Sequence, residues 1–262
     1  MQRLFVIKIG GNVIDRSEAL DIFLNRFSKI QEPKILIHGG GAIATRIGEK
    51  LQIKSNYVNG RRITDAETLD LVTMVYGGLI NKKIIARLQQ LGSNAMGVTG
   101  ADGNLLSATK RKPGTVDYGF VGDLTPASVN HELLNLLLNN RIIPVFAPLT
   151  HADGTMLNTN ADTIASTVAV AMSNHFNVRL MYCFEKAGVL EDVNNPESVI
   201  KKINQEKYAS LLKAGVLHDG ILPKLENAFD AIRAGVREVL IGDAEHLEKN
   251  TSAETTGTLI TL

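Results

Sequence analysis

Short apolar runs alternate along the chain with longer stretches whose apolar positions recur at helical spacing. Most of the short runs are apolar on both faces, which is typical of strands that helices cover on each side. We expect strands over residues 4–9, 34–38, 94–99, 142–146, 178–183 and 238–241. We expect helices over residues 18–30, 42–51, 66–91, 129–139, 161–173, 205–214 and 223–234.

This alternation predicts an α/β fold with a doubly wound, mainly parallel central sheet sandwiched by helices. Residues 105–123 interrupt it with short β-like pieces around Gly and Pro, which indicates a small β-hairpin region beside the sheet. We expect one domain over residues 1–262, with an N-lobe over about 1–147 and a C-lobe over about 148–262.

The composition is that of a globular protein, with 44% apolar and 21% charged residues. A net charge of +1 gives no global attraction to nucleic acid or to an anionic membrane. The single cysteine, Cys183, excludes an internal disulfide and a cysteine-cluster metal site. Lys8 ends the first apolar run early, so we expect no signal peptide, and no run reaches the roughly 18 residues of a membrane span. We therefore expect a cytoplasmic protein with neither a nucleic-acid nor a membrane partner.

Three glycine-rich turns follow predicted strands: Gly10-Gly11, Gly39-Gly40-Gly41, and Gly100 with Gly103. Glycine lets backbone N–H groups approach a ligand closely, and adjacent N–H groups form an anion-binding concavity. One such turn is explained by a tight strand–helix connection alone. Three of them at the carboxyl ends of strands favour phosphate binding, because α/β sheets bind ligands at that edge.

The residues that follow these turns exclude one known type of phosphate site and leave another open. The chain has no Gly-Lys dipeptide, which excludes a Walker A loop. Residues 39–44 fit the loose pattern of a dinucleotide-binding turn, but Arg61 and Arg62 stand about where its ribose-binding acid is expected. An arginine pair suits a 2′-phosphate, so an NADP-binding protein remains an alternative.

Lys8 interrupts an apolar strand directly before Gly10-Gly11. A lysine buried in a strand costs free energy unless its charge is paired or used. The simpler interpretation is a lysine at a strand end that reaches solvent. Beside a turn shaped for anions, we favour a phosphate-binding lysine.

Two further segments carry polar residues at predicted helix starts. Asn160 is a plausible N-cap, and Asp162 in the first turn complements the helix dipole, but neither role explains Asn158. Lys224 follows residues 218–220 (His-Asp-Gly) in another first turn. A cation there opposes the dipole, so another group should hold it.

Taken together, these segments resemble the amino acid kinase family, and within it the enzymes of arginine biosynthesis that phosphorylate N-acetyl-L-glutamate. The resemblance runs in order along essentially the whole chain. It rests on residues 8–11 (KIGG), 38–41 (HGGG), 59–64 (NGRRIT), 98–103 (VTGADG), 119–122 (GFVG), 158–162 (NTNAD), and 219–220 (DG) with Lys224.

The resemblance implies transfer of the ATP γ-phosphoryl group to the side-chain carboxylate of an N-acylated glutamate. A carboxylate is already deprotonated at neutral pH, so the reaction needs positioning and charge neutralisation rather than a general base. The implied catalytic residues are Lys8 and Lys224, which contact the transferring group, and Asp162, which holds both ammonium groups. Gly10 and Gly11 would join the two lysines at the ATP phosphates, with Mg²⁺ bridging those phosphates and no metal site of the protein itself.

On the acceptor side, the resemblance implies substrate binding by Gly40, Gly41, Arg62 and Asn158. The bidentate guanidinium of Arg62 suits the α-carboxylate of the amino acid. One departure from the family pattern lies on the nucleotide side. Phe184 and Glu185 stand where the family usually has a hydroxyl residue and an aspartate, which leaves the details of ATP binding open.

Other acceptors and functions remain open. N-succinyl-L-glutamate differs from the acetyl compound only by an extended acyl group, and a glutamate 5-kinase-like enzyme would use the same carboxylate without any acyl group. A non-catalytic protein that binds a nucleotide or an amino acid is a further alternative. Retention of Lys8, Asp162 and Lys224 favours a catalyst, because a binding module does not need a transition-state clamp.

The resemblance also implies a homodimer. In this family, arginine-inhibited enzymes carry an extra N-terminal helix, whereas only three residues precede the first strand here. We therefore expect insensitivity to arginine. Apolar positions within residues 66–91 offer a surface for pairing, or they pack against the sheet: Leu69, Leu71, Val72, Met74 and Val75.

Overall fold

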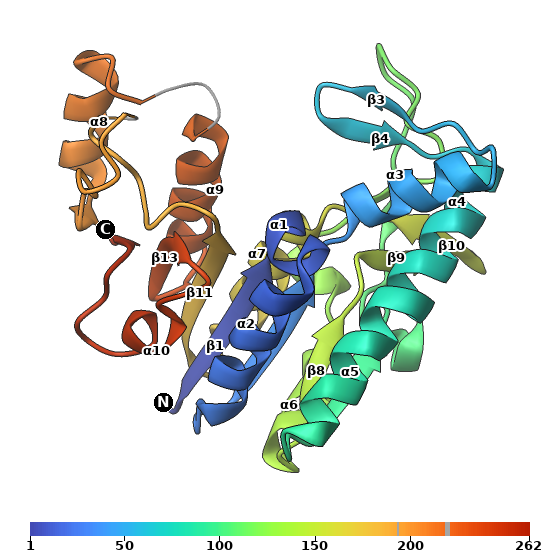
Figure 1. The fold of residues 1–262 in the computed structure, drawn as a ribbon, viewed down its shortest axis with the longest axis horizontal. Coiled ribbons are helices and arrows are strands. Elements are labelled where there is room, and N and C mark those ends of the chain that lie inside the picture. Colours follow the sequence, from blue (N-terminus) through green and yellow to red (C-terminus); the bar gives the residue numbers. More distant parts are fainter. Residues whose placement is uncertain (193, 218–220) are drawn as a thin grey trace.

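The computed structural model describes residues 1–192, 194–217 and 221–262, and an eight-stranded sheet runs through its centre (Figure 1). The strands of this sheet are β1 (Arg3–Ile9), β2 (Lys34–His38), β5 (Ala95–Val98), β8 (Ile143–Phe146), β11 (Asn177–Phe184), β12 (Lys202–Ile203), β13 (Glu238–Asp243) and β14 (Thr258–Ile260). Their order is β12-β14-β13-β11-β1-β2-β8-β5. Neighbours are parallel except for the antiparallel pair β13–β14. The predicted doubly wound, mainly parallel sheet is confirmed.

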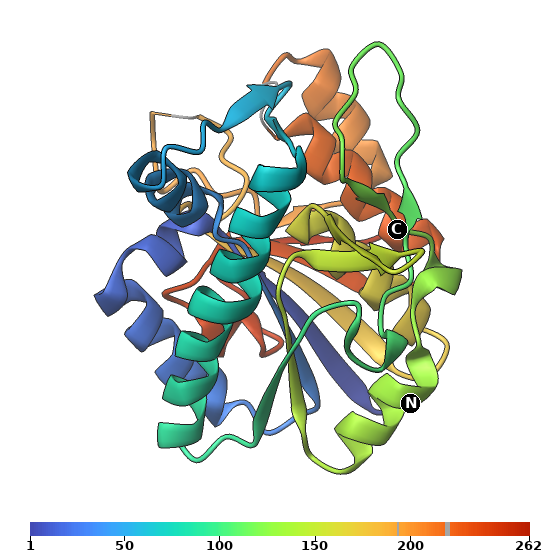
Figure 2. The ribbon, with the colours of Figure 1, turned by 90° about the vertical axis from the view of Figure 1, so that its right-hand side faces the viewer.

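Helices cover both faces of the sheet (Figures 1 and 2). They are α1 (Gly11–Asp15), α2 (Ser17–Lys29), α3 (Gly41–Lys50), α4 (Ala66–Val72), α5 (Asn81–Gln90), α6 (His131–Asn139), α7 (Ala161–Met172), α8 (Gln205–Lys213), α9 (Leu222–Arg233) and α10 (Leu247–Asn250). Within the described residues, no helix combines the length and the apolar character needed to cross a membrane.

The alternation of side chains along β1 shows how the two layers form. Leu4 and Val6 belong to one core, which α6, α7, α8 and α9 complete, whereas Phe5, Ile7 and Ile9 belong to the other, with α2, α4, α5 and α10. All five side chains are fully buried. A central strand covered in this way must be apolar on both faces, which explains the apolar run and makes Lys8 exceptional.

Three small antiparallel hairpins lie beside the main sheet. They are β3 (Asn56–Val58) with β4 (Arg61–Ile63), β6 (Thr109–Lys110) with β7 (Gly122–Asp123), and β9 (Leu149–Ala152) with β10 (Thr155–Asn158). The second confirms the hairpin expected within residues 105–123. The other two were not predicted, because strands of three or four residues are too short to show alternation clearly.

The helix expected over residues 66–91 has three parts. Between α4 and α5 lies a π-helical segment, η1 (Thr73–Ile80), whose wider turn the apolar spacing does not reveal. Five apolar positions of residues 66–91 were expected either to pair subunits or to pack against the sheet. Leu69, Leu71, Val72 and Val75 are buried in the core, and Met74 is exposed. The helix expected from residue 129 begins at His131, because the Asn130 side chain accepts a hydrogen bond from Leu133 N at 3.1 Å.

His38, the last residue of β2, is fully buried. Its Nδ1 lies 2.7 Å from the Gly39 carbonyl oxygen and its Nε2 lies 3.2 Å from Asn81 Nδ2. A neutral ring that donates from Nδ1 and accepts at Nε2 satisfies both contacts. Burial is the main cause that lowers the pKa of His38 to about 4.

This pKa makes stability dependent on pH. The folded pKa lies below that of the unfolded chain, so the unfolded state binds the proton first as the pH falls. Stability is therefore complete above about pH 6.5 and declines toward pH 4. Between pH 7.5 and pH 5, we expect His38 alone to cost about 2 kcal/mol of the free energy of unfolding.

Urea unfolding at the two pH values measures this loss. A His38→Gln variant should lose about 2 kcal/mol less than the wild type over this interval, whatever its stability at pH 7.5. A His175→Gln control, which changes an exposed histidine, should keep the wild-type difference. Equal losses in the wild type and His38→Gln would contradict the prediction.

Candidate active site

Two glycine turns lie side by side where β1 and β2 end. Gly10 N donates to the Cys183 carbonyl at 3.2 Å, and Gly39 N donates to the Ile9 carbonyl at 3.2 Å. Gly40 has a φ of +147°, and a Cβ there would lie 2.3 Å from Ile80 Cδ1. The positive φ and the close Ile80 side chain of η1 both favour glycine at this position. Helix α3 begins at the next residue, Gly41, so its first N–H groups have no partner within the helix.

Lys8 and Asp162 meet at this edge. Lys8 lies on β1 between Ile37 of β2 and Tyr182 of β11, and its side chain is only 15% exposed. Its Nζ lies 2.8 Å from an Asp162 carboxylate oxygen. A cation next to the last residue of a buried strand therefore has its charge paired, as the sequence required.

Helix α7 holds Asp162 in place. Asn160 is its N-cap, as predicted, and the side-chain oxygen accepts hydrogen bonds from Asp162 N at 2.8 Å and Thr163 N at 3.2 Å. The carboxylate of Asp162 therefore stands on the first turn of a twelve-residue helix, where the helix dipole favours negative charge.

Lys224 lies in the first turn of α9, with its Nζ 4.2 Å from the centroid of the Phe184 ring. Burial is the largest influence on the Lys224 pKa and lowers it. The negative charge of Asp162 opposes this effect, the positive charge of Lys8 adds to it, and Glu185 opposes it. The ammonium is thus in the electrostatic reach of the Lys8–Asp162 pair. The predicted segment 218–220 lies outside the described residues.

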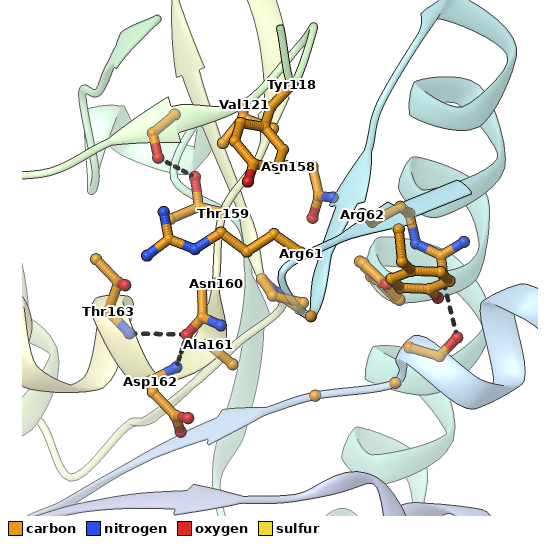
Figure 3. A pocket seen from close by; sticks show the side chains of 18 of the residues that line it. Arg61, Arg62, Tyr118, Val121, Asn158, Thr159, Asn160, Ala161, Asp162 and Thr163 are labelled. Carbon is orange, nitrogen blue, oxygen red and sulfur yellow. Dashed lines mark hydrogen bonds between the residues drawn. The ribbon is translucent and has the colours of Figure 1, made fainter. Parts of the chain in front are cut away.

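A cavity of about 270 Å³ opens between these elements (Figure 3). Its walls are the two glycine turns, the start of α7, the β3–β4 hairpin and the segment 111–122. Lys8, Gly11, Gly40, Gly41, Arg62, Asn158 and Asp162 all contribute to its lining, so the structure brings most of the predicted site residues together. Gly10 lies next to the lining residue Gly11, and Lys224 lines a neighbouring cavity.

Arg61 and Arg62 are adjacent on β4 and point in opposite directions (Figure 3). Arg62 is 6% exposed, and its Nη2 donates to the Gly41 carbonyl and to Thr45 Oγ1, both at 2.9 Å. It also donates to Ser55 Oγ. Arg61 is exposed and extends into the cavity toward Thr159. The sequence singled out Arg62 alone, although the two-residue period of a strand already places its neighbour on the opposite face.

Asn158, the last residue of β10, does not cap a helix but connects β10 to two neighbouring segments. Its Nδ2 donates to Thr64 Oγ1 at 3.0 Å, and its backbone N donates to the Phe120 carbonyl at 3.0 Å. These bonds join β10 to the ends of the β3–β4 hairpin and of segment 111–122. Asn158 therefore fixes the walls of the cavity that it lines.

Arg111 is a cavity residue that the sequence analysis missed. Its Nε lies 3.0 and 3.2 Å from the two Asp123 carboxylate oxygens, and its guanidinium lies 5.6 Å from the Tyr118 ring centroid. Its partner Asp123 lies on β7, which pairs with β6. The sequence analysis did not identify Arg111 because it could not predict the pairing of these two short strands.

The third glycine turn, around Gly100, is structural. A Cβ on Gly100 would lie 2.6 Å from the Leu106 carbonyl oxygen and 2.8 Å from Thr150 Cα. Strand β5, which leads into this turn, is the edge strand of the sheet, three places from β1. The lining of the 270 Å³ cavity includes neither Gly100 nor Gly103 among the described residues. The inference of three ligand-facing turns was therefore wrong for this one.

A second cavity of about 240 Å³ lies beside Lys224. Its lining includes Phe184, Val189, Leu190, Val216 and Ile221, so its walls are largely apolar. An apolar cavity that ends at a lysine suits a ligand with a planar apolar part and an anionic part.

The charges of the larger cavity favour a ligand with several negative groups. Lys8 and Arg111 each have a carboxylate partner, whereas Arg62 binds neutral oxygens and Arg61 faces the cavity. Cys183 does not offer a nucleophile, because burial raises the pKa of its thiol to about 12. The arrangement can position anions and neutralise their charge.

Comparisons with known proteins agree with this geometry. A model of the amino acid kinase family matches residues 3–243. Acetylglutamate kinase of Parabacteroides distasonis is 52% identical over 95% of this chain and 97% of its own length, and that of Cytophaga hutchinsonii is 55% identical over 94% of each chain. The crystal structure of smu.665 from Streptococcus mutans superposes with a TM-score of 0.77 at 30% identity, covering 99% of this chain and 98% of that one. The NADP-binding alternative is set aside by these likenesses.

Proposed function

We infer that this chain, which belongs to the amino acid kinase family, transfers the γ-phosphoryl group of ATP to the side-chain carboxylate of N-acetyl-L-glutamate. This reaction belongs to arginine biosynthesis. The observation that carries the inference is the Lys8–Asp162 pair, 2.8 Å apart, at the edge of a cationic cavity between two glycine turns. Relatives named for this activity match nearly the full length of the chain.

We propose that catalysis rests on placement and charge. The acceptor carboxylate is ionised at neutral pH, so no group has to remove a proton from it. Lys8 and Lys224 neutralise the charge that spreads over the oxygens of the transferring phosphoryl group. Asp162 keeps both ammonium groups beside the line of transfer, which the 2.8 Å pair with Lys8 and its effect on the Lys224 pKa support.

The glycine turns divide the remaining binding between the two substrates. Backbone N–H groups at Gly10 and Gly11 join Lys8 and Lys224 at the ATP phosphates, and those at Gly40 and Gly41 hold the acceptor. The base of ATP occupies the apolar cavity of about 240 Å³ that Lys224 borders.

Mg²⁺ enters, in this proposal, with the nucleotide. Among the described residues, no three His, Cys, Asp or Glu side chains gather into a metal site. Asp162, the carboxylate of the cavity, is paired with Lys8. This donor set fits a cation held mainly by phosphate oxygens, the usual state of Mg²⁺ in kinases. When bound there, Mg²⁺ neutralises part of the phosphate charge.

The acceptor α-carboxylate is bound, we propose, by the arginines of β4 together with Asn158. Arg62 anchors the hairpin to the first turn of α3 through the Gly41 carbonyl and Thr45, and Arg61 reaches into the cavity. A guanidinium that lacks a carboxylate partner suits a carboxylate ligand, because the fork of N–H groups binds both oxygens.

At the level of the whole chain, we propose that an N-lobe over about 1–147 binds the acylglutamate and a C-lobe over about 148–262 binds ATP. Asn158 lies beyond that boundary but reaches the acceptor cavity through β10. We also propose a cytoplasmic homodimer that pairs through the exposed Met74 and Leu79 of η1. Light scattering tests the dimer.

A coupled ADP-release assay tests the function directly. N-acetyl-L-glutamate should support turnover with ATP, whereas glutamate without the acyl group should not. N-succinyl-L-glutamate belongs in the same series, because it extends the acyl group by one carboxylate-bearing arm. Absence of turnover with every acceptor would leave a binding protein as the remaining interpretation.

The proposed contacts of Lys8 and Lys224 with the transferring phosphoryl group predict a specific kinetic defect. Lys8→Ala and Lys224→Ala should each lower kcat roughly 10²- to 10³-fold, as expected when a preorganised charge is removed from a developing anion. KM should change far less, because these contacts strengthen in the transition state. Lys110→Ala, which removes an exposed lysine outside both cavities, serves as the control. Near wild-type kcat in both clamp variants would refute the assignment.

The two arginines should separate by their effects. Arg61→Gln should raise KM for the acceptor roughly 10-fold or more and leave KM for ATP and the stability unchanged. Arg62→Lys should raise the acceptor KM and also lower the free energy of unfolding by about 1–3 kcal/mol, because buried hydrogen bonds to Gly41, Thr45 and Ser55 are lost. Steady-state kinetics and urea unfolding measure both. A loss of ATP affinity instead would assign the arginines to the phosphate site.

A further inference from the structure

Phe184 lies at the carboxyl end of an inner strand of the sheet. It is the last residue of β11, which pairs with β1 on one side and with β13 on the other. The carbonyl of the preceding residue, Cys183, accepts the hydrogen bond from Gly10 N. The Phe184 side chain is half-buried and packs against the core. Its backbone and its ring are therefore both fixed relative to the first glycine turn.

The ring presents its face to the Lys224 ammonium. Nζ lies 4.2 Å from the ring centroid, within the range of a cation–π interaction. Asp162 contacts Lys8 at 2.8 Å and acts on Lys224 as a charge that raises its pKa. Among the described residues, the side chain that the Lys224 ammonium contacts is Phe184.

The contact lines one cavity and lies within the electrostatic reach of residues that line the other. Phe184 and Lys224 line the apolar cavity of about 240 Å³, whereas Lys8 and Asp162 line the cavity of about 270 Å³. Lys224 lies in the first turn of α9, where the dipole disfavours a cation, and its partial burial also disfavours the charge. A π face attracts an ammonium most strongly where water is partly excluded, and a serine or threonine at position 184 would not provide one.

We propose that Phe184 is a positioning residue for phosphoryl transfer, whose ring face holds the Lys224 ammonium in the nucleotide cavity, within the electrostatic reach of residues that line the acceptor cavity. The proposal rests on the proposed function for its kinetic consequence. The contact between ring and ammonium stands independently of the reaction. Position 184, at which this chain departs from the family pattern, thereby acquires a role in placing Lys224.

Two substitutions separate the face of the ring from its bulk. Phe184→Leu keeps a buried apolar side chain and removes the π face, whereas Phe184→Tyr keeps the face. Phe120→Leu is the matched control, because it removes a comparable pair in which Lys110 Nζ lies 4.4 Å from the Phe120 ring centroid. For each protein, kcat and both KM values are measured with ATP and N-acetyl-L-glutamate across the alkaline pH range.

We expect Phe184→Leu to lower kcat roughly 3- to 30-fold with little change in the acceptor KM. The alkaline limb of its kcat–pH profile should move to lower pH. Leucine preserves the burial that lowers the Lys224 pKa and removes the ring face that favours the charged ammonium. Among the described residues, the other charges that act on Lys224 are Asp162, Lys8 and Glu185, and they are the same in every variant. Phe184→Tyr should restore both properties, and Phe120→Leu should leave the alkaline limb in place.

A substrate-free measurement separates this inference from the proposed function. The pH dependence of Lys224 acetylation by acetic anhydride, followed by mass spectrometry, reports its pKa without turnover. A lower midpoint in Phe184→Leu than in the wild type supports the contact even if no acceptor is phosphorylated. An unchanged midpoint and alkaline limb, with only KM for ATP raised, would show that the ring contacts the nucleotide instead and would overturn the proposal. Failure of Phe184→Tyr to restore kcat would overturn it as well.

Discussion

The burial of one ammonium group in the central strand is the constraint on which the site depends. Lys8 lies between two parallel neighbours, so its charge is compatible with the fold only if a carboxylate reaches it from outside the sheet. Asp162 does so because α7 packs on the face of β1 that Leu4 and Val6 help to form, and because Asn160 fixes where that helix begins. The requirements of folding and of catalysis thus fall on the same ion pair.

The same edge tolerates a second violation of local preference. Lys224 is a cation at a helix start, half-buried, with its pKa lowered by burial. Sequences that fold well usually avoid such conflicts, and natural proteins keep them where function requires them. Asp162 pairs directly with Lys8, whereas Lys224 feels the charges of Asp162 and Glu185 without an ion pair to either among the described residues. Its ammonium is therefore available to a phosphoryl group, which supplies negative charge only when it binds.

The sequence predicts six of the eight strands of the central sheet and its longer helices, because long periodic segments are decided by burial on one or both faces, but it does not predict the short β12, β14, α1 and α10. Strands β1, β2, β5, β8, β11 and β13 all lie within two residues of their expected bounds, and the largest difference is at the end of β13, which extends to Asp243. The short hairpins were harder to predict, since their pairing partners are set by tertiary contacts such as Asn158 with Thr64. The Gly100 turn shows the limit of motif reasoning. Its glycine is required by close backbone packing, which a ligand-facing turn and a structural turn share.

For the site, sequence reasoning identified residue types but not directions. Arg61 and Arg62 are equivalent as letters, yet the pleat of β4 sends one into the cavity and commits the other to Gly41, Thr45 and Ser55. The buried Arg62 holds the hairpin against α3, so the exposed Arg61 extends from an anchored strand. Ordering one guanidinium through neutral oxygens leaves its positive charge uncompensated, and the charge of Arg61 adds to it. The hairpin therefore contributes attraction for a carboxylate without adding a carboxylate of its own to the cavity lining among the described residues. This division of labour between adjacent residues explains how a three-residue strand can be both a structural anchor and a binding surface.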